Sequence, residues 1–266
     1  GGGPQRLGPA PVGRHPPPSA GCPGGEPATR RGTHMGVTTS SPHLRCASPD
    51  DLDAVRDLLT DVFLVDPLMS TIIGAAPEPR AALEHLHHVE LSATYLNPAH
   101  PASLGDLAVD DAGRLLGVAL WDAPDPAGAD SSDHTATPTS PANPAGPLGP
   151  HGEPPAGLDL ELLGDAWELC LLDGTMCEAE RPAEPHWYLY MIAVAPGARG
   201  TGTGAALLRR GLERVDAQGT VAHLEATTRR AASFYGRHGF VDGAILNSEG
   251  RLPDYWAMTR PKRRQH

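Results

Sequence analysis

The most constraining feature of this chain is a strand-like run that passes through a glycine-rich turn into an amphipathic helix. Residues 187–194 are rich in aromatic and β-branched side chains, which favour a β-strand. Alternation with a period of two predicts that four of these side chains share one face, those of Tyr188, Tyr190, Ile192 and Val194. Pro196 ends the strand, and residues 204–217 then repeat leucine and valine at helical spacings. This order predicts an α/β fold.

The turn between this strand and helix is suited to bind an anion. Glycines at positions 200, 202 and 204 remove Cβ atoms where consecutive backbone N–H groups have to converge. The turn precedes a helix N-terminus, where free amides and the helix dipole attract negative charge. We therefore expect a phosphate or diphosphate there. A turn that only ends the strand is the structural alternative.

Two common phosphate-binding motifs do not fit this spacing. A P-loop needs Lys and then Ser or Thr after its last glycine, whereas Gly204 is followed by Ala205 and Ala206. A dinucleotide-binding fingerprint separates its second and third glycines by three positions, whereas Gly202 and Gly204 are two apart. The spacing therefore excludes both classes of nucleotide site.

The rest of the chain supplies further helices and strands. Ser48 and Pro49 predict the start of a helix that ends near Leu64, after which Asp66-Pro67 predicts a loop with an exposed carboxylate. Other helices are expected at 80–96, 158–180 and 229–238, and other strands at 104–109, 114–121, 221–226, 244–246 and 255–259. Strand, helix and strand in succession imply a crossover connection within a mixed sheet.

Two segments are too rich in glycine and proline to join this core. The chain has 31 Gly and 29 Pro in 266 residues, and 17 of these fall in residues 1–34 and 14 in residues 123–157. Both segments are poor in large apolar side chains, so they bury too little surface to offset the entropy lost on ordering. We expect one domain at 35–261 with a flexible insertion at 123–157, a disordered extension or added segment at 1–34, and a basic tail at 262–266.

The net charge limits which partners we expect, and the cysteines indicate the cellular compartment. The formal charge is −11, with 20 Arg and a single Lys, so nucleic acid and membranes, which attract clustered cations, are not expected as partners. The four cysteines, Cys22, Cys46, Cys170 and Cys177, form no C-x-x-C pair and no zinc-finger spacing. This pattern predicts a reduced, cytoplasmic protein whose cysteines are small core residues.

The glycine-rich turn is also the first part of a longer pattern. The pattern reads Val194-x-Pro196-x-x-Arg199-Gly200-x-Gly202-x-Gly204, then Leu224-Glu225-Ala226-Thr227, then Phe234-Tyr235-Gly236-Arg237-His238-Gly239-Phe240. These three elements, in this order, resemble the acyl-CoA signature of the GNAT superfamily of N-acetyltransferases. The match is dense from about Trp187 to Phe240 and thinner elsewhere. The resemblance implies a mixed, mostly antiparallel sheet flanked by helices, with acetyl-CoA as co-substrate.

The resemblance also implies which residues hold the cofactor. In this family, main-chain amides from the arginine onward wrap the CoA diphosphate, which here implies Arg199, Gly200, Thr201, Gly202, Thr203, Gly204 and Ala205. The strand before the turn splays from the next strand at a bulge and pairs with pantetheine, a role that falls to Ile192, Ala193 and Val194. An amide near Ala193 would stabilise the carbonyl oxygen as it becomes anionic. Thr228 stands where many members carry an Asn that contacts the cofactor.

Two residues are the candidates for proton transfer. Tyr235 corresponds to the family tyrosine that protonates the departing thiolate, and a phenol of pKa about 10 can supply a proton to a thiolate of pKa about 8.5. A ring that only packs is the alternative for Tyr235. Glu225, at a strand end, is the candidate base for the amine, with Asp66 and Tyr190 as further groups of the acceptor pocket.

The histidines predict no metal site. His85, His87 and His88 put an i, i+3 pair on one helix, but no third ligand converges on it, so a surface cluster is the simpler interpretation. His238 is part of the third signature element, where we expect it to pack or cap. No metal is expected.

These observations predict direct transfer of an acetyl group from acetyl-CoA to the primary amine of a small molecule. No cysteine lies in the signature region, which disfavours a covalent enzyme intermediate. The acidic composition slightly favours a cationic acceptor. A protein or peptide N-acetyltransferase and a non-catalytic acyl-CoA sensor remain the alternatives, although the presence of Tyr235 favours an enzyme. Neither the acceptor nor the oligomeric state follows from the residues.

Overall fold

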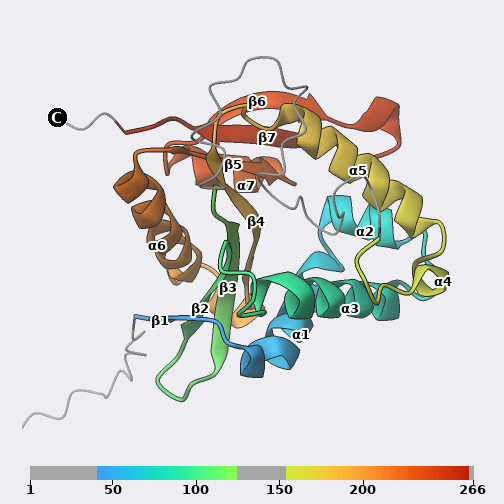
Figure 1. The fold of residues 1–266 in the computed structure, drawn as a ribbon, viewed down its shortest axis with the longest axis horizontal. Helices are drawn as coiled ribbons and strands as arrows, with labels where there is room; N and C mark the ends of the chain where they lie inside the picture. The colour runs from blue at the N-terminus through green and yellow to red at the C-terminus, as the bar shows by residue number, and fades with distance from the viewer. Residues whose placement is uncertain (1–40, 125–153, 264–266) are drawn as a thin grey trace, which may run out of the picture. The chain divides into compact units, whose positions relative to one another are not determined.

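A computed structural model describes residues 41–124 and 154–263 (Figure 1). All of them belong to one structural unit, which starts at Thr39. The extension predicted at 1–34 and most of the insertion predicted at 123–157 lie outside the described residues. The described residues therefore lie mainly within the domain predicted at 35–261.

A mixed sheet forms the centre of this unit. In the described residues it has seven strands in the order β1-β2-β3-β4-β5-β7-β6. They are β1 His43–Cys46, β2 Ser103–Val109, β3 Leu115–Asp122, β4 His186–Val194, β5 Val221–Ala226, β6 Val241–Leu246 and β7 Tyr255–Arg260. Only β4 and β5 pair in parallel, and the other neighbours are antiparallel. The mixed, mostly antiparallel sheet is confirmed, and β1 is an addition to the sequence prediction.

Helices flank the sheet on both faces (Figure 1). They are α1 Leu52–Phe63, α2 Pro67–Ile73, α3 Pro79–Glu90, α4 Leu160–Leu163, α5 Ala166–Glu180, α6 Thr203–Gln218 and α7 Arg229–Gly236. A π-helical segment, Leu91–Tyr95, extends α3. The single helix expected at 158–180 is two helices, because Gly164 between them has a φ of +52°. None of the helices in the described ranges has the length and apolarity needed to cross a bilayer.

Helix α6 packs very closely against one face of the sheet. Its inner side chains are fully or almost fully buried, as the sequence predicts, namely Leu207, Leu208, Leu212 and Val215. A Cβ atom added at Gly211 would lie 2.2 to 2.4 Å from atoms of the Trp121 indole ring on β3. Only glycine allows this approach, because real Cβ contacts are not that short. The contact fixes α6, and therefore the turn that begins it, relative to the sheet.

The opposite face is covered by α1, α3 and the π-helical segment. Val55 and Leu59 of α1 and Leu91 and Tyr95 of the segment share a core cluster with Met191 of β4. A 3-10 turn, Pro49–Asp51, follows the predicted cap Ser48 and leads into α1. The Ser48 backbone N–H and hydroxyl donate to the Asp51 carboxylate at 2.8 and 2.9 Å. The two sheet faces thus have separate cores.

Where a loop was expected after α1, the chain forms α2. Asp66 is the N-cap of this helix and Pro67 its first residue. Proline suits the first helical position because it has no N–H to lose there. The predicted exposed loop carboxylate is therefore wrong, since Asp66 is half-buried and bonded to the helix that it starts.

Strand β4 contains a bulge that changes its alternation. Leu120 of β3 pairs with Met191, but the next residue, Trp121, pairs with Leu189. Tyr190 is thus the extra residue of a β-bulge.

The bulge moves the residues after it to different faces from those predicted. Tyr190 packs with the α1 cluster, whereas Ile192 packs against the cluster that contains the α6 leucines. Val194 also faces α6, because its Cγ2 lies 3.4 Å from a Cβ built at Gly204. The predicted common face of Tyr188, Tyr190, Ile192 and Val194 is therefore wrong beyond Tyr190.

Candidate active site

Strands β4 and β5 separate part-way along their length. Their parallel ladder runs from His186 and Val221 only to Tyr188 and His223. On its other edge, β4 continues to pair with β3 to its last residue. The β5-facing edge of residues 189–194 therefore has no ladder partner in the described structure. The bulge lies at this fork, and bulges increase local twist.

The open edge presents the backbone groups of alternate residues. The N–H of Ala195 donates to the Leu116 carbonyl of β3 at 2.9 Å, and hydrogen-bonded pairs alternate along an antiparallel ladder. The backbone of Ala193 is therefore directed to β3, and the backbones of Ile192 and Val194 to the open edge. Consistent with this, Arg199 Nε donates to the Val194 carbonyl at 3.3 Å. Of the three predicted pantetheine partners, Ala193 is the one turned away.

The turn after β4 contains a row of amides without acceptors. The first helical bond of α6 runs from the Ala206 N–H to the Gly202 carbonyl at 2.9 Å. Within the described part of the chain, no acceptor is found for the amides from Gly200 to Ala205. The Arg199 amide differs from the prediction, because it donates to the Pro196 carbonyl at 3.4 Å. The open amides thus start one residue later than expected.

The conformation of the turn depends on two glycines. Gly200 has a φ of +79° and Gly202 a φ of +90°, in the left-handed region that other residues rarely adopt. A Cβ atom at either position would meet nothing within 4 Å, so the space beside the turn is open. The Thr201 hydroxyl donates to the Ala198 carbonyl at 2.7 Å and braces the turn. Successive amides in such a turn form a concave anion site.

Helix α7 brings Phe234, the neighbour of Tyr235, close to the start of α6. A Cβ at Gly204 would lie 3.9 Å from the Phe234 ring, so α7 is packed against the first turn of α6. The Tyr235 ring is 7% exposed and meets the Phe240 ring edge-on at 5.8 Å between centroids. Burial, and to a smaller degree the Asp66 carboxylate, raise the pKa of Tyr235 well above its usual range. The phenol therefore keeps its proton at neutral pH.

Asp66 and Thr228 both cap helices. Asp66 Oδ1 accepts from two N–H groups in the first turn of α2, at 3.0 and 3.2 Å, and its Oδ2 accepts from the Thr227 hydroxyl at 2.5 Å. Asp66 thereby ties α2 to the end of β5. Thr228 Oγ1 accepts from the Ala231 N–H at 3.1 Å. The Thr228 carbonyl accepts from the Ala232 N–H at 2.9 Å, so the hydroxyl proton and the backbone N–H of Thr228 are what remains for a cofactor.

Glu225 lies on the face of β5 that is turned away from α6. Its Oε2 accepts from the Tyr188 hydroxyl at 2.6 Å, and its Oε1 is 3.2 Å from His223 Nε2. That second contact is not aligned as a hydrogen bond, so Oε1 is buried without a partner in the described structure. The Arg181 guanidinium stacks over the Tyr188 ring, 4.0 Å from its centroid. An unpaired carboxylate oxygen next to a fork can accept a proton from a ligand.

A second acid, Glu90, reaches the fork from α3. Tyr190 at the bulge donates its hydroxyl proton to Glu90 Oε1 at 2.8 Å, and Tyr95 stacks on the Tyr190 ring at 5.2 Å. Burial raises the pKa of the Glu90 carboxyl to about 8, although the Tyr190 hydrogen bond opposes the shift. Glu90 was not among the site residues predicted from the sequence. The available signal was its spacing, since it follows the buried Leu83 and Leu86 by seven and four residues on one helix face.

The three histidines of α3 do not act together. His85 Nε2 accepts from the Asp159 N–H at 2.9 Å, and His88 is exposed. His87 is fully buried with its Nδ1 3.2 Å from the Thr60 hydroxyl, so its assignment to a surface cluster is wrong. No group of three or more metal-binding side chains gathers anywhere in residues 41–124 or 154–263.

Comparison with known proteins agrees with this geometry. Residues 169–242, which include the fork, the turn and Tyr235, match the family described as the acetyltransferase (GNAT) domain. A solved structure from Corynebacterium glutamicum, described as histone acetyltransferase HPA2 and related acetyltransferase, is 29% identical, with a TM-score of 0.57 over 85% of this chain and 99% of that chain. Residues 169–242 are therefore a GNAT acetyltransferase domain. Arylalkylamine N-acetyltransferase 2 from Aedes aegypti shares the fold, with 13% identity and a TM-score of 0.53 over 84% of this chain and 99% of that one.

GNAT acetyltransferases use acetyl-CoA as co-substrate, and the residues at the fork and the turn fit it. The open amides from Gly200 to Ala205 suit a diphosphate, and the open space beside Gly202 leaves room for it. The unpaired edge of β4 suits an extended amide chain such as pantetheine. The resemblance inferred from the signature is thus confirmed at the level of the family, the fold and the co-substrate.

Proposed function

We propose that this GNAT acetyltransferase transfers the acetyl group of acetyl-CoA directly to the primary amine of a small cationic molecule. The observation that carries the proposal is the concentration of buried acids behind the fork. Glu225 and Glu90 contact β4 tyrosines there, and the Glu225 carboxylate adds to the effect of burial in raising the pKa of Asp173 on α5. An ammonium group is attracted to such carboxyls and favours their charged forms, which burial alone disfavours.

Cofactor binding would position the thioester at the fork. The amides from Gly200 to Ala205 would hold the diphosphate, and the backbone groups of Ile192 and Val194 on the unpaired edge of β4 would pair with pantetheine. The same alternation favours the Ile192 amide, rather than the Ala193 amide, for stabilising the carbonyl oxygen as it becomes anionic. Holding thioester and amine side by side makes their reaction effectively intramolecular, which removes a large part of the barrier.

Proton transfer would then involve one residue on each side of the fork. The amine nitrogen bonds to the thioester carbonyl carbon, the C–S bond breaks, and sulfur leaves with the electron pair. Tyr235 would donate its proton to that sulfur, and the unpaired Oε1 of Glu225 would take the proton of the amine. Because the pKa of Tyr235 is raised, we expect this donation to accompany C–S cleavage rather than precede it.

A protein or peptide acceptor is the second candidate. It is favoured by the 29% identity to the Corynebacterium glutamicum structure, which is described as a histone acetyltransferase and related acetyltransferase. Every residue of the cofactor site would be the same for both acceptor classes. The two candidates therefore differ only in which class of acceptor is acetylated with release of CoA thiol.

A thiol-release assay over an acceptor panel tests the proposal. The panel contains polyamines, arylalkylamines, amino acids and histone-tail peptides, with acetyl-CoA as donor. We expect turnover with small cationic amines. Turnover with peptides alone would support the second candidate, and binding of acetyl-CoA with no turnover on any acceptor would contradict catalysis.

Two variants of Gly202 make the assay specific for the turn. Asn and Asp have the same shape and tolerate the left-handed conformation better than most residues, so they differ mainly in charge. Gly202→Asp should abolish thiol release by repelling the diphosphate, whereas Gly202→Asn should retain a measurable fraction. Equal activity of the two variants would contradict anion binding at this position.

A further inference from the structure

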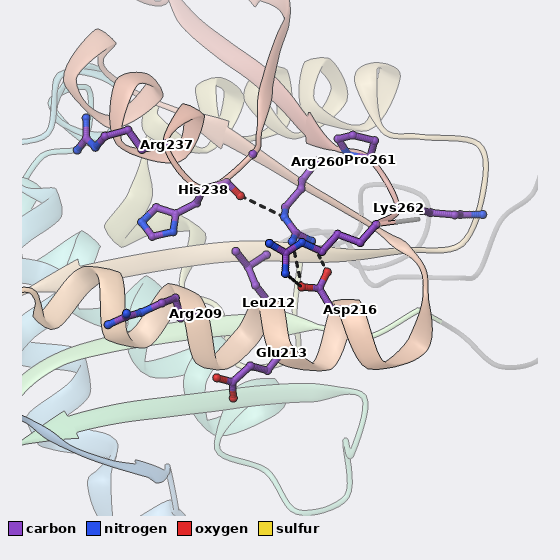
Figure 2. Close-up of a pocket in the computed structure, with 11 residues that line it drawn as sticks. Arg209, Leu212, Glu213, Asp216, Arg237, His238, Arg260, Pro261 and Lys262 are labelled. Atoms are coloured by element: carbon purple, nitrogen blue, oxygen red, sulfur yellow. Dashed lines mark hydrogen bonds and ion pairs between the residues drawn. The ribbon is translucent and has the colours of Figure 1, made fainter. Parts of the chain in front are cut away.

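Arg260, the last residue of β7, is a buried cation that contacts two other elements. Its side chain is 6% exposed, and its guanidinium makes two bonds to the Asp216 carboxylate of α6, at 2.7 and 3.0 Å. Its Nε donates to the His238 carbonyl, in the turn after α7, at 3.1 Å. Figure 2 shows Arg260 between these two partners, with dashed lines to both. One side chain thus connects β7, α6 and the end of α7.

The turn that Arg260 reaches also holds the backbone of Tyr235. The His238 and Phe240 N–H groups both donate to the Tyr235 carbonyl, at 2.8 and 3.2 Å. Gly239 has a φ of +91°, and a Cβ added there would lie 3.5 Å from Arg260 Nε, so the Arg260 side chain lies against this turn. A chain of hydrogen bonds therefore runs from α6 through Arg260 and the turn to Tyr235.

Helix α6 is the fixed partner in this arrangement. Its close contact with Trp121 holds it on the sheet, and its start carries the amides proposed to bind the diphosphate. There, a Cβ built at Gly204 would lie 3.9 Å from the Phe234 ring of α7. Arg260 adds a second attachment at Asp216, which lies about 18 Å of helical rise beyond Gly204. The end of α7, which carries the candidate acid, is therefore held to α6 at two separate points.

The pair of Arg260 and Asp216 is suited to fix geometry. Removing two charges from water is costly, and a buried ion pair often adds no more stability than apolar side chains of similar size. The planar guanidinium, however, matches a carboxylate in a defined orientation, so it sets how the two groups lie. Such precision matters near a reacting centre, because a displacement of about 1 Å can lower a rate by about 10²-fold.

We propose that Arg260 is a positioning residue for catalysis, which holds the Tyr235 hydroxyl where the departing thiolate forms. It acts through the turn after α7 and not by contact with the reacting atoms. The proposal rests on the acid role proposed for Tyr235. Arg263 lies 3.3 Å from the same Asp216 carboxylate, but its side chain is 75% exposed, and solvent weakens such a pair. Arg263 is therefore the matched control.

Amide hydrogen exchange tests the link to the turn without any acceptor. Arg260→Gln removes the charge and the paired donors, so the His238 and Phe240 amides should exchange at least about tenfold faster than in wild-type protein. Arg260→Lys keeps a cation beside Asp216 but loses the planar fork, so it should have a smaller effect in the same direction. This variant carries the tests if Arg260→Gln does not fold. Arg263→Gln should leave these amides unchanged, and unchanged exchange in the Arg260 variants would overturn the link.

A double-mutant cycle on kcat tests whether the link positions the phenol. The assays use saturating acetyl-CoA and the small amine of the panel that wild-type protein acetylates fastest. Arg260→Gln should lower kcat by about tenfold in wild-type protein, but by less than about twofold in Tyr235→Phe, because no hydroxyl is left to misplace. A residue that only stabilises the fold would lower both values by the same factor. Arg263→Gln should change neither.

The outcomes separate this role from the proposed function. Equal losses of kcat with and without the Tyr235 hydroxyl, or no loss in the Arg260 variants, would overturn the positioning role while leaving acid catalysis intact. Wild-type kcat in Tyr235→Phe alone would overturn the acid role and this inference with it. Faster exchange in the turn, together with a loss of kcat confined to proteins that keep Tyr235, would support the inference.

Discussion

Burial decides what Tyr235 can do. Its ring packs in the core beside Phe234 and Phe240, while its hydroxyl lies where the Asp66 charge acts on it. The raised pKa keeps the proton on the phenol, which a general acid needs, and makes early loss of that proton costly. Packing and acid catalysis are thus compatible roles for one residue, and a variant that keeps the ring separates them.

Tyr235→Phe should retain cofactor binding and lose turnover. The ring and its packing remain, so we expect an unchanged affinity for acetyl-CoA by calorimetry and an unchanged thermal unfolding midpoint. The value of kcat should fall by about 10²-fold or more, as expected for loss of a general acid. A kcat equal to that of wild-type protein would show that the ring only packs.

The residues of the site differed in how well the sequence predicted them. Tyr235 and Glu225 stand in short patterns with characteristic neighbours, so one sequence sufficed to select them. Glu90 and Arg181 lie in other elements and meet the fork only through tertiary packing with Tyr190 and Tyr188. Contacts of this kind leave no local signal beyond a polar residue on an otherwise apolar helix face.

At the scale of elements, most long periodic segments were predicted well, although the helix expected at 158–180 is two helices, and the shortest elements were missed. Helix α6 and strand β5 were predicted within a residue of their observed ends. Strand β1 has four residues and helix α2 has seven, which is too short for a reliable period. The bulge at Tyr190 was implied only by the family resemblance, because a single inserted residue does not change the composition of a strand. It nevertheless decides which residues face the cofactor.

The contact between α6 and β3 gives a prediction about stability. Gly211→Ala would place a methyl group within 2.4 Å of the Trp121 ring, so either α6 or the ring has to move. We expect a loss of about 1–3 kcal/mol in the free energy of unfolding, measured with denaturant. Gly197→Ala is the control, because a Cβ there meets nothing within 4 Å and should change stability little. Equal stability of the two variants would contradict the close packing of α6.

At the scale of the whole molecule, the buried acids make stability depend on pH. Burial raises the pKa of Glu90 to about 8 and the pKa values of Asp122 and Asp173 to about 6. A group whose pKa is higher in the folded state binds more protons there than in the unfolded state. Its stabilising effect is complete below its unfolded pKa and is lost as pH rises through the folded value.

Glu90→Gln should therefore reduce the loss of stability on the alkaline side. Between about pH 5 and about pH 8, Glu90 should contribute a fall of up to about 1.4 kcal/mol per pH unit to the unfolding free energy of wild-type protein. The amide cannot ionise, so the variant should show a shallower pH dependence in denaturant titrations. Parallel curves for the two proteins would mean that Glu90 is not buried as an acid.

The order of the strands in the sheet did not follow from the sequence alone. It depends on pairings between segments far apart in the chain, such as β1 with β2 and β5 with β7. Periodicity reports which face of a strand is buried but not which strand lies beside it. The family resemblance supplied the fold class, and the comparisons confirmed it. The boundaries predicted for the extension and the insertion stay predictions.

Amide-resolved hydrogen exchange tests most directly whether the backbone amides of the glycine-rich turn bind acetyl-CoA. In the free protein, the amides from Gly200 to Ala205 have no acceptors in the described structure and should exchange rapidly. Saturation with acetyl-CoA should slow their exchange strongly, while amides at the far end of α6, near Gln218, change little. Unchanged exchange from Gly200 to Ala205 at saturating acetyl-CoA would contradict the diphosphate site and the function derived from it.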